Sequence, residues 1–188
     1  DRDWSSDVCS SDLDDIGIWN RALSASEIAS IAGGDPIGGR AIPAPLVTDE
    51  LVALWDFNGG DFTDSVGEFH GEGSGTEPIQ FIPGRDGFGQ ALRLDGTDQM
   101  VEIIGGEPDD LAFEGGSVSI GAWFRVGEFD KNWQAMIAKG EGSNWRVARR
   151  GGSNLMSYAG GIGDTNDAGP DVNDGEWHHL LAVTDAEG

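Results

Sequence analysis

Two adjacent histidines and a scatter of carboxylates are the residues of this sequence that could transfer protons. His178 and His179 fall in a run with the alternation of a β-strand, in which neighbouring side chains point to opposite faces. They therefore cannot converge on one substrate or metal, and no Ser, Cys or third ligand stands at a catalytic spacing from them. Glu102 stands alone in a strand pattern, and the acidic residues of 109–114 fall in a turn pattern. No catalytic residue is predicted.

The acidic loops are the next candidates, because carboxylates and backbone carbonyls are the ligands that Ca²⁺ prefers. Residues 171–175 (DVNDG) resemble a calcium loop but lack one residue before the glycine and the bidentate Glu beyond it. We interpret this segment as a turn before a strand at Trp177. Asp164, Asn166 and Asp167 leave a loose calcium site open there.

Exposed aromatic rings beside polar groups would suit a carbohydrate, since such rings are apolar with a polar rim. Trp133, Trp145 and Tyr158 stand at strand ends or near Gly-rich loops, and with Arg149 they form the predicted ligand-binding set. A packing role for these rings remains open. The basic cluster of Arg146, Arg149 and Arg150 is interpreted as a solvated strand face, with an anionic-glycan contact as the alternative.

Composition limits the partners. The chain has 188 residues with eleven Lys and Arg against 34 Asp and Glu, a net charge of −23 at pH 7. Nucleic acid and anionic membranes need clustered cations, so neither is an expected partner, whereas divalent cations suit this surface. No apolar span long enough to insert into a membrane occurs. A hydrophobic content of 38% with 31 Gly and 7 Trp indicates a globular, turn-rich protein.

The first thirteen residues stand apart from the rest. Residues 3–13 (DWSSDVCSSDL) match one translated reading frame of a common sequencing adapter, and we exclude residues 1–13 from the fold on that ground. Cys9, the single cysteine, lies within this segment and is not expected to be native. Without another cysteine, a disulfide scaffold is excluded.

Residues 14–34 combine a strand pattern with a helix start. Ile16 and Ile18 alternate before Trp19, and Ser24 and Glu27 have the spacing of a capping box. Leu23 and Ile28 occupy the positions of a hydrophobic staple, and Gly33 with Gly34 ends the helix. Residues 35–48 are aperiodic and Pro-rich, as is typical of an interdomain linker.

The remaining chain alternates like antiparallel strands that face a core on one side. In residues 117–126, Val118, Ile120, Ala122, Phe124 and Val126 fall on one face, a period of two that excludes a helix. The predicted strands are 51–57, 90–94, 100–103, 117–126, 134–139, 145–149, 155–158 and 177–184. Many short strands with Gly-rich and Asp-rich turns indicate an all-β antiparallel sandwich or jelly roll, with one short helix near the N-terminus.

Four segments in this order, 51–57 (LVALWDF), 87–98 (GFGQALRLDGTD), 118–124 (VSIGAWF) and 175–180 (GEWHHL), resemble the LamG-like jelly-roll domains of the concanavalin A-like lectin/glucanase superfamily. Residues 14–28 resemble the closing segment of the same family. The resemblance implies a LamG-like domain over 49–188 that is C-terminally truncated, an incomplete jelly roll preceded by the closing strand and helix of another copy.

The resemblance also implies a calcium site and the absence of catalysis. Many members hold Ca²⁺ between the first strand, the following loop and the closing strand. The matching positions are Asp56, Asp64 with the backbone of Gly67 to Gly71, and either Asp14 or Asp15. The related glucanases carry a Glu-x-Asp-x-(x)-Glu strand motif that this sequence lacks, so no enzyme is expected.

The expected function is that of a non-catalytic carbohydrate-binding or adhesion module, calcium-stabilised and carried by a secreted or cell-surface multidomain protein. A polysaccharide or glycoprotein and neighbouring domains of the same chain are the expected partners. A ligand-free spacer is the first alternative and a glycoside hydrolase-related domain the second. One structural hypothesis follows from the truncation: the strand at 15–20 fills the vacant edge and pairs beside 51–57.

Overall fold

The structure is a computed structural model that describes residues 10–33, 47–107, 110–113, 115–139, 144–160 and 169–186. Residues 35–46 of the predicted linker lie outside these ranges, as do Cys9, Asp109, Glu114 and the loose calcium candidates Asp164, Asn166 and Asp167. The elements are β1 (Ser10–Trp19), α1 (Ala25–Ala32), β2 (Leu51–Trp55), β3 (Gly71–Ser74), β4 (Gln80–Pro83), β5 (Gln90–Asp95), β6 (Met100–Ile103), β7 (Val118–Glu128), β8 (Ala135–Ala138), β9 (Trp145–Arg149), β10 (Met156–Gly160) and β11 (His178–Thr184). The predicted all-β antiparallel sandwich with one short helix is confirmed.

The larger sheet is built around β1. Its strand order is β11-β7-β1-β5-β4, and β2 also pairs with β1. β7 follows one edge of β1, whereas the other edge is shared by β5 along Ser10–Leu13 and β2 along Ile16–Trp19. The hypothesis that residues 15–20 pair beside 51–57 is confirmed.

Excluding Ser10–Leu13 from the fold was wrong. These residues form the first part of β1 and pair on both edges, which satisfies their backbone donors and acceptors. Asp12 is buried and bonds to Arg93 (2.7 Å) and Arg125 (2.8 Å) from the neighbouring strands. A strand accepts this segment because its side chains alternate, with Leu13 facing the core, and because the single charge, Asp12 on the opposite face, is paired.

A bulge interrupts β1 at Asp14 and Asp15. The register shifts between Asp14 and Gly17, and Asp15 has a φ of 46°, which is unusual for a residue other than glycine. The extra residue lets Leu13, Ile16 and Ile18 all join the same core despite their uneven spacing. The bulge thereby sets the direction of the two carboxylates at the centre of the sheet.

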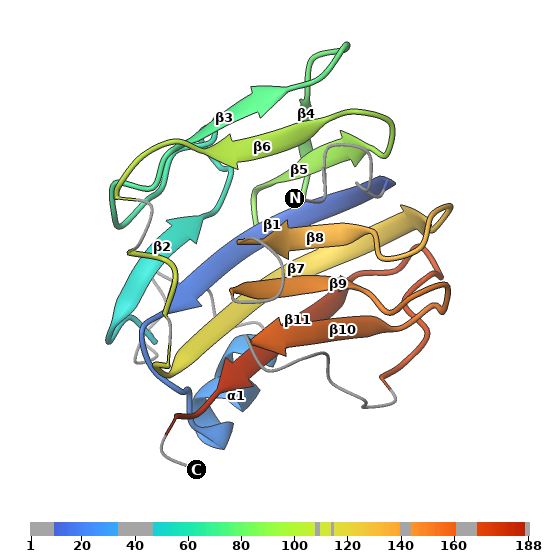
Figure 1. Cartoon of the computed structure of the whole chain (residues 1–188). Coiled ribbons are helices and arrows are strands. Elements are labelled where there is room, and N and C mark those ends of the chain that lie inside the picture. The colour runs from blue at the N-terminus through green and yellow to red at the C-terminus, as the bar shows by residue number, and fades with distance from the viewer. Residues whose placement is uncertain are drawn as a thin grey trace.

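The second layer consists of a three-stranded sheet, β10-β9-β8, and a separate two-stranded sheet, β3-β6 (Figure 1). The predicted inward face of β7 packs against Trp145 and Val147 of β9 and Tyr158 of β10. β3 and β4 were not predicted, because Gly-Glu-Gly-Ser has no apolar alternation and residues 80–83 end in proline. The core lies between the two layers.

Helix α1 covers one end of the outer face of the larger sheet. The predicted capping box is present, with Ser24 and Glu27 bonding each other's backbone N–H, and Gly33 follows the helix as its C-cap. A second apolar cluster forms beneath the helix, and it includes both staple residues, Leu23 and Ile28. Ser119 of β7 accepts from the Leu23 N–H (2.9 Å) and so anchors the segment to the sheet.

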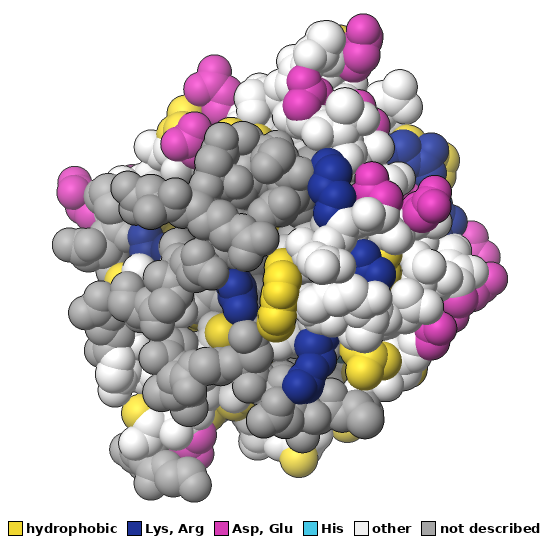
Figure 2. All heavy atoms as spheres, turned by 45° about the vertical axis from the view of Figure 1, so that its right-hand side comes forward, with side chains coloured by type: hydrophobic (Ala, Val, Ile, Leu, Met, Phe, Trp, Pro, Cys, Tyr) yellow, Lys and Arg dark blue, Asp and Glu magenta, His cyan; other side chains and the backbone are white. Residues whose placement is uncertain are grey.

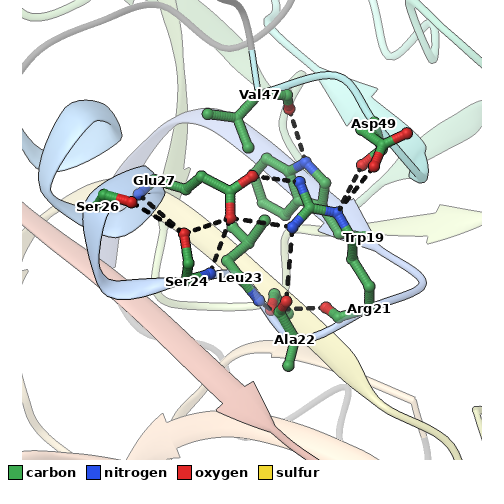
Figure 3. Close-up of polar contacts among 10 residues, drawn as sticks. Trp19, Arg21, Ala22, Leu23, Ser24, Ser26, Glu27, Val47 and Asp49 are labelled. Atoms are coloured by element: carbon green, nitrogen blue, oxygen red, sulfur yellow. Dashed lines mark hydrogen bonds and ion pairs between the residues drawn. The ribbon is translucent and has the colours of Figure 1, made fainter.

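The same segment is tied to the residues that precede β2 (Figure 3). Arg21 binds the Glu27 carboxylate through two nitrogens (3.0 and 2.6 Å) and donates to the Asp49 carbonyl (3.0 Å). The Trp19 indole donates to the Val47 carbonyl (2.8 Å). Residues 14–33 are therefore joined to the later strands by side chains as well as by the sheet.

Candidate functional site

Asp64 shapes the loop after β2. It is buried, and its carboxylate accepts from the backbone N–H of Leu54 (2.9 Å), Val66 (3.0 Å) and Phe69 (3.1 Å). Gly71, in β3, has no room for a side chain, because an added Cβ would lie 2.6 Å from Val101. The fold therefore accounts for the presence of both Asp64 and Gly71 without a bound metal.

Asp14 and Asp15 have more of the properties expected of a cation site than Asp64 and Gly71 have. Asp14 is only 1% exposed, and both of its carboxylate oxygens lack a hydrogen-bond partner among the described residues. Burial, together with the charges of Asp15 and Asp56, raises the pKa of Asp14 to about 8, against the opposing effects of the Asp15 backbone and of Arg85. Asp14, Asp15 and Asp56 therefore interact through their charges.

Asp56 accepts from the Asn58 N–H (3.0 Å) and from the Ser65 hydroxyl (3.2 Å). Within the described ranges, no group of three or more His, Cys, Asp or Glu side chains is placed to hold a metal ion. The calcium site stays a prediction. The five residues predicted for it divide between three carboxylates whose charges interact, Asp14, Asp15 and Asp56, and a structural pair, Asp64 and Gly71.

A guanidinium covers the outer face beside Asp14. Arg85 stacks between the rings of Phe88 (3.5 Å) and Trp123 (3.8 Å), and its Nε and Nη2 have no hydrogen-bond partner in the part of the chain that the structure describes. Sequence reasoning missed this residue. The only signal was its place in a Gly-rich turn, which does not say what the turn covers.

The two histidines diverge as predicted. His178 contacts the ring of Phe124 on the core side (5.7 Å) and bonds Asp174 (2.9 Å), whereas His179 contacts Trp123 on the outer side (5.0 Å). Burial and the nearby charge of Arg85 lower the pKa of His179 to about 4. His179 is therefore neutral at physiological pH.

Three of the four predicted ligand-binding residues are buried. The Trp145 indole donates to the Leu111 carbonyl (2.7 Å), and the Tyr158 hydroxyl bonds Thr184 (2.8 Å). Arg149 donates to the carbonyls of Ser153 and Gly152, among others, and braces the turn after β9. These side chains hold loops and core together, so they do not form the exposed binding surface that the sequence predicted.

Trp133 is the exception. It is half-buried, it lies before β8, and its ring is stacked by the guanidinium of Arg146 (4.9 Å). Its φ is 61°, a left-handed conformation that is strained for a bulky side chain. Its N–H donates to the Gly151 carbonyl (3.0 Å) at the turn between β9 and β10, which holds the ring at that end of the three-stranded sheet.

Lys and Arg side chains interleave with hydrophobic ones on the face that includes the right-hand ends of β8, β9 and β10 (Figure 2). Asp and Glu side chains lie towards the periphery of the same view. Within this view the Lys and Arg side chains thus lie nearer the centre than most of the carboxylates.

A protein-family model described as the concanavalin A-like lectin/glucanases superfamily matches residues 95–188, half of the chain. This chain belongs to the concanavalin A-like lectin/glucanases superfamily. Comparisons with curated proteins and with solved structures find no match.

The superfamily match runs from the last residue of β5 through β11. It therefore contains β7 and β11 of the larger sheet and all of β8, β9 and β10. The remaining strands of the larger sheet, β1, β2, β4 and most of β5, precede the match, and β1 joins them to it by pairing with β7. Membership supports a carbohydrate-binding or structural role. Among the described residues, no helix has the length and apolar character of a membrane span.

Proposed function

We propose that this chain is a non-catalytic carbohydrate-binding or adhesion module of a secreted or cell-surface protein. The observation that carries the proposal is the half-exposed ring of Trp133, held in a strained backbone conformation and stacked by Arg146. Such conformations cost about 1–3 kcal/mol and cluster at functional sites. Phe57 and Phe113 share the positive φ, so the stacking and partial exposure of Trp133 complete the argument. A ring with an adjacent guanidinium offers a sugar both an apolar surface and hydrogen-bond donors.

The polysaccharide or glycoprotein glycan would lie across the end of the three-stranded sheet near Trp133. The basic and apolar side chains that share a face of the molecule extend the area for contact beyond one ring (Figure 2). A ligand-free spacer remains the alternative function, and binding experiments separate the two.

The experiment is affinity electrophoresis of the full chain against a panel of polysaccharides, with Trp133→Ala and Trp177→Ala side by side. Trp177 is a matched control because it too is half-buried beside an arginine, Arg125 (5.1 Å), which Asp12 already engages. We expect Trp133→Ala to bind the polysaccharide about tenfold more weakly and so to be retarded less, and Trp177→Ala to be retarded like the parent chain. Binding that survives Trp133→Ala contradicts the proposed site, and no retardation by any polysaccharide favours the spacer.

Calcium stabilisation is a second proposal, and it rests on the unpartnered carboxylate of Asp14. Asp14 would hold the ion together with Asp15 or Asp56, and backbone carbonyls and water would complete a shell of six to eight oxygens. A bound Ca²⁺ would add two positive charges to the one that Arg85 supplies near Asp14 and Asp15. Calcium at about a hundred times its Kd should add roughly 2.7 kcal/mol to the free energy of unfolding.

The test compares thermal unfolding in calcium and in chelator. We expect the Tm of the parent chain to rise by several degrees in calcium and that of Asp14→Asn to stay unchanged. An equal rise in both proteins would place the ion elsewhere, and no rise in either would contradict calcium binding.

A further inference from the structure

A cleft separates the two parts of the second layer. β3-β6 and β10-β9-β8 are not hydrogen-bonded to each other, and a cavity of about 260 Å³ lies between β6 and the end of β8. Its side-chain lining combines three aromatic residues, Trp55, Phe69 and Trp145, with three charged ones, Glu102, Glu107 and Lys139. None of these residues belongs to the Trp133 site.

The cleft is a consequence of how the chain leaves β6. The N–H groups of Ile104 and Gly105 both donate to the His70 carbonyl (3.0 and 3.2 Å), which turns the chain towards residues 68–70 and away from β8. Gly105 packs so closely there that a Cβ would lie 1.9 Å from the Glu68 carbonyl oxygen. The close backbone packing keeps the two sheets apart.

The aromatic walls have no polar group left for a ligand. The Trp55 indole donates to the Phe69 carbonyl (2.8 Å), and the Trp145 indole donates to the Leu111 carbonyl (2.7 Å). All three rings are at most 7% exposed, so they are held in place by the core. They can offer a ligand only apolar contact and the negative charge of their π-faces.

The charged side chains also favour a cation. Glu102 and Glu107 are exposed and outnumber Lys139, which is partly buried. Carboxylates accept hydrogen bonds and donate none when ionised, so a neutral sugar would find few donors in this lining. A metal ion would find only the two carboxylates of the charged set as ligands, because the remaining walls are aromatic and aliphatic.

We propose that this cleft binds a small organic ammonium cation, its alkylated nitrogen against Trp55, Phe69 and Trp145 and its charge balanced by Glu102 and Glu107. Aromatic walls attract such cations through the ring quadrupole, and the attraction grows when water is excluded. A cavity of about 260 Å³ restricts the ligand to a group of choline or betaine size. The net charge of −23 raises the local concentration of cations around the mouth.

The experiment is a calorimetric titration of the full chain with choline chloride and, separately, with 3,3-dimethylbutan-1-ol, its uncharged carbon analogue. We expect choline to bind at least about tenfold more tightly than the alcohol, since only choline gains the cation–π and carboxylate attraction. Equal affinities, or no measurable binding of choline, overturn the proposal.

Charge variants assign the site. Glu102→Gln combined with Glu107→Gln should weaken choline binding by at least about tenfold, whereas Lys139→Gln should strengthen it by a few fold. Glu72→Gln is the matched control, because Glu72 lies directly across the β3-β6 ladder from Glu102 and does not line the cleft. If Glu72→Gln weakened choline binding as much as the double variant does, the effect would be one of long-range charge, and the proposed site would be contradicted.

This inference is independent of the Trp133 proposal. Trp133→Ala should bind choline like the parent chain, and the double carboxylate variant should keep its polysaccharide binding. Thermal unfolding of each variant accompanies the titrations, and a variant that melts like the parent chain but has lost choline binding locates the effect in the cleft.

Discussion

The carboxyl group of Asp14 is buried at the centre of the larger sheet without a hydrogen-bond partner among the described residues. A buried carboxylate without compensation is costly, so such a group takes up a proton or a cation. The pKa of about 8 means that Asp14 takes up a proton at neutral pH, and the proposed calcium ion would be the alternative. Sequence reasoning named Asp14 as a calcium candidate, but its isolation depends on which strands surround it.

Asp14→Asn should stabilise the chain in chelator at alkaline pH. The pKa of Asp14 in the folded chain, about 8, lies above the usual value of 3.8. The free energy of unfolding of the parent chain therefore falls as pH rises from about 4 to about 8. The variant lacks this ionisation, and its advantage should be near zero at pH 4 and on the order of 1–3 kcal/mol at pH 8.

Thermal unfolding between pH 4 and pH 9 measures this difference. Asp86→Asn, an exposed carboxylate in the turn that carries Arg85, should show no comparable trend. A variant advantage that does not change with pH would contradict the assigned ionisation.

Glu27→Gln should be less stable than the parent chain, and this difference should depend on pH in the opposite sense to that of Asp14→Asn. Arg21 and Ser24 lower the pKa of Glu27 to about 2 from the usual 4.5, so the contribution is present above about pH 4.5 and lost as pH falls towards 2. The capping glutamate and its ion pair contribute about 1 kcal/mol, or a Tm difference of roughly 2–4 °C at pH 7.

The two proteins should converge in Tm near pH 2. Glu128→Gln, at the exposed end of β7, serves as the control and should match the parent chain throughout. A Tm gap that stays constant down to pH 2 would assign the loss to packing and not to charge.

At the scale of elements, alternation predicted β2 and β5 to β11 but failed for β3 and β4. β7 showed five apolar residues at a period of two, and all five lie in the core. β3 has no such signal, because its pairing with β6 is made by backbone groups around two glycines. The turn after β6 likewise depends on a backbone contact that only glycine permits.

Gly105→Ala should therefore destabilise the fold by about 2–4 kcal/mol and lower the Tm by roughly 5–15 °C. The added methyl would meet the Glu68 carbonyl oxygen at 1.9 Å and the His70 nitrogen at 2.8 Å, and neither can move without shifting the loop. Gly169→Ala is the control, since nothing lies within 4 Å of its Cβ position. Equal melting of the two variants would show that the loop relaxes freely.

At the scale of the whole molecule, the first strand in the sequence is central to the sheet. β1 pairs with β2, β5 and β7, and its apolar residues join a core to which both layers contribute. The origin of residues 14–34 in a preceding domain stays a prediction, as do the domain boundaries at 34 and 48. In this structure the segment is an integral part of one sandwich.

Ile18→Ala tests that role. Ile18 is fully buried, so the cavity should cost about 2–5 kcal/mol, and the loss should appear in the unfolding of the whole sandwich as one transition. Ile104→Ala removes the same atoms from a side chain that is 60% exposed and should change stability by less than about 0.5 kcal/mol. Similar melting of the two variants would contradict the placement of β1 in the core.

Sequence alone determined the features that depend on local hydrogen bonding and on period: the capping box of Ser24 and Glu27, the inward face of β7, the divergence of His178 and His179, and the superfamily. Tertiary structure alone decided which side chains are exposed. Trp133 and Trp145 both flank predicted strands, yet only Trp145 is enclosed, by residues as distant as Leu111. The same holds for the unpartnered carboxyl of Asp14 and for the cleft between β6 and β8. Burial is set by packing between segments that are remote in the chain, and no local pattern records which segments will meet.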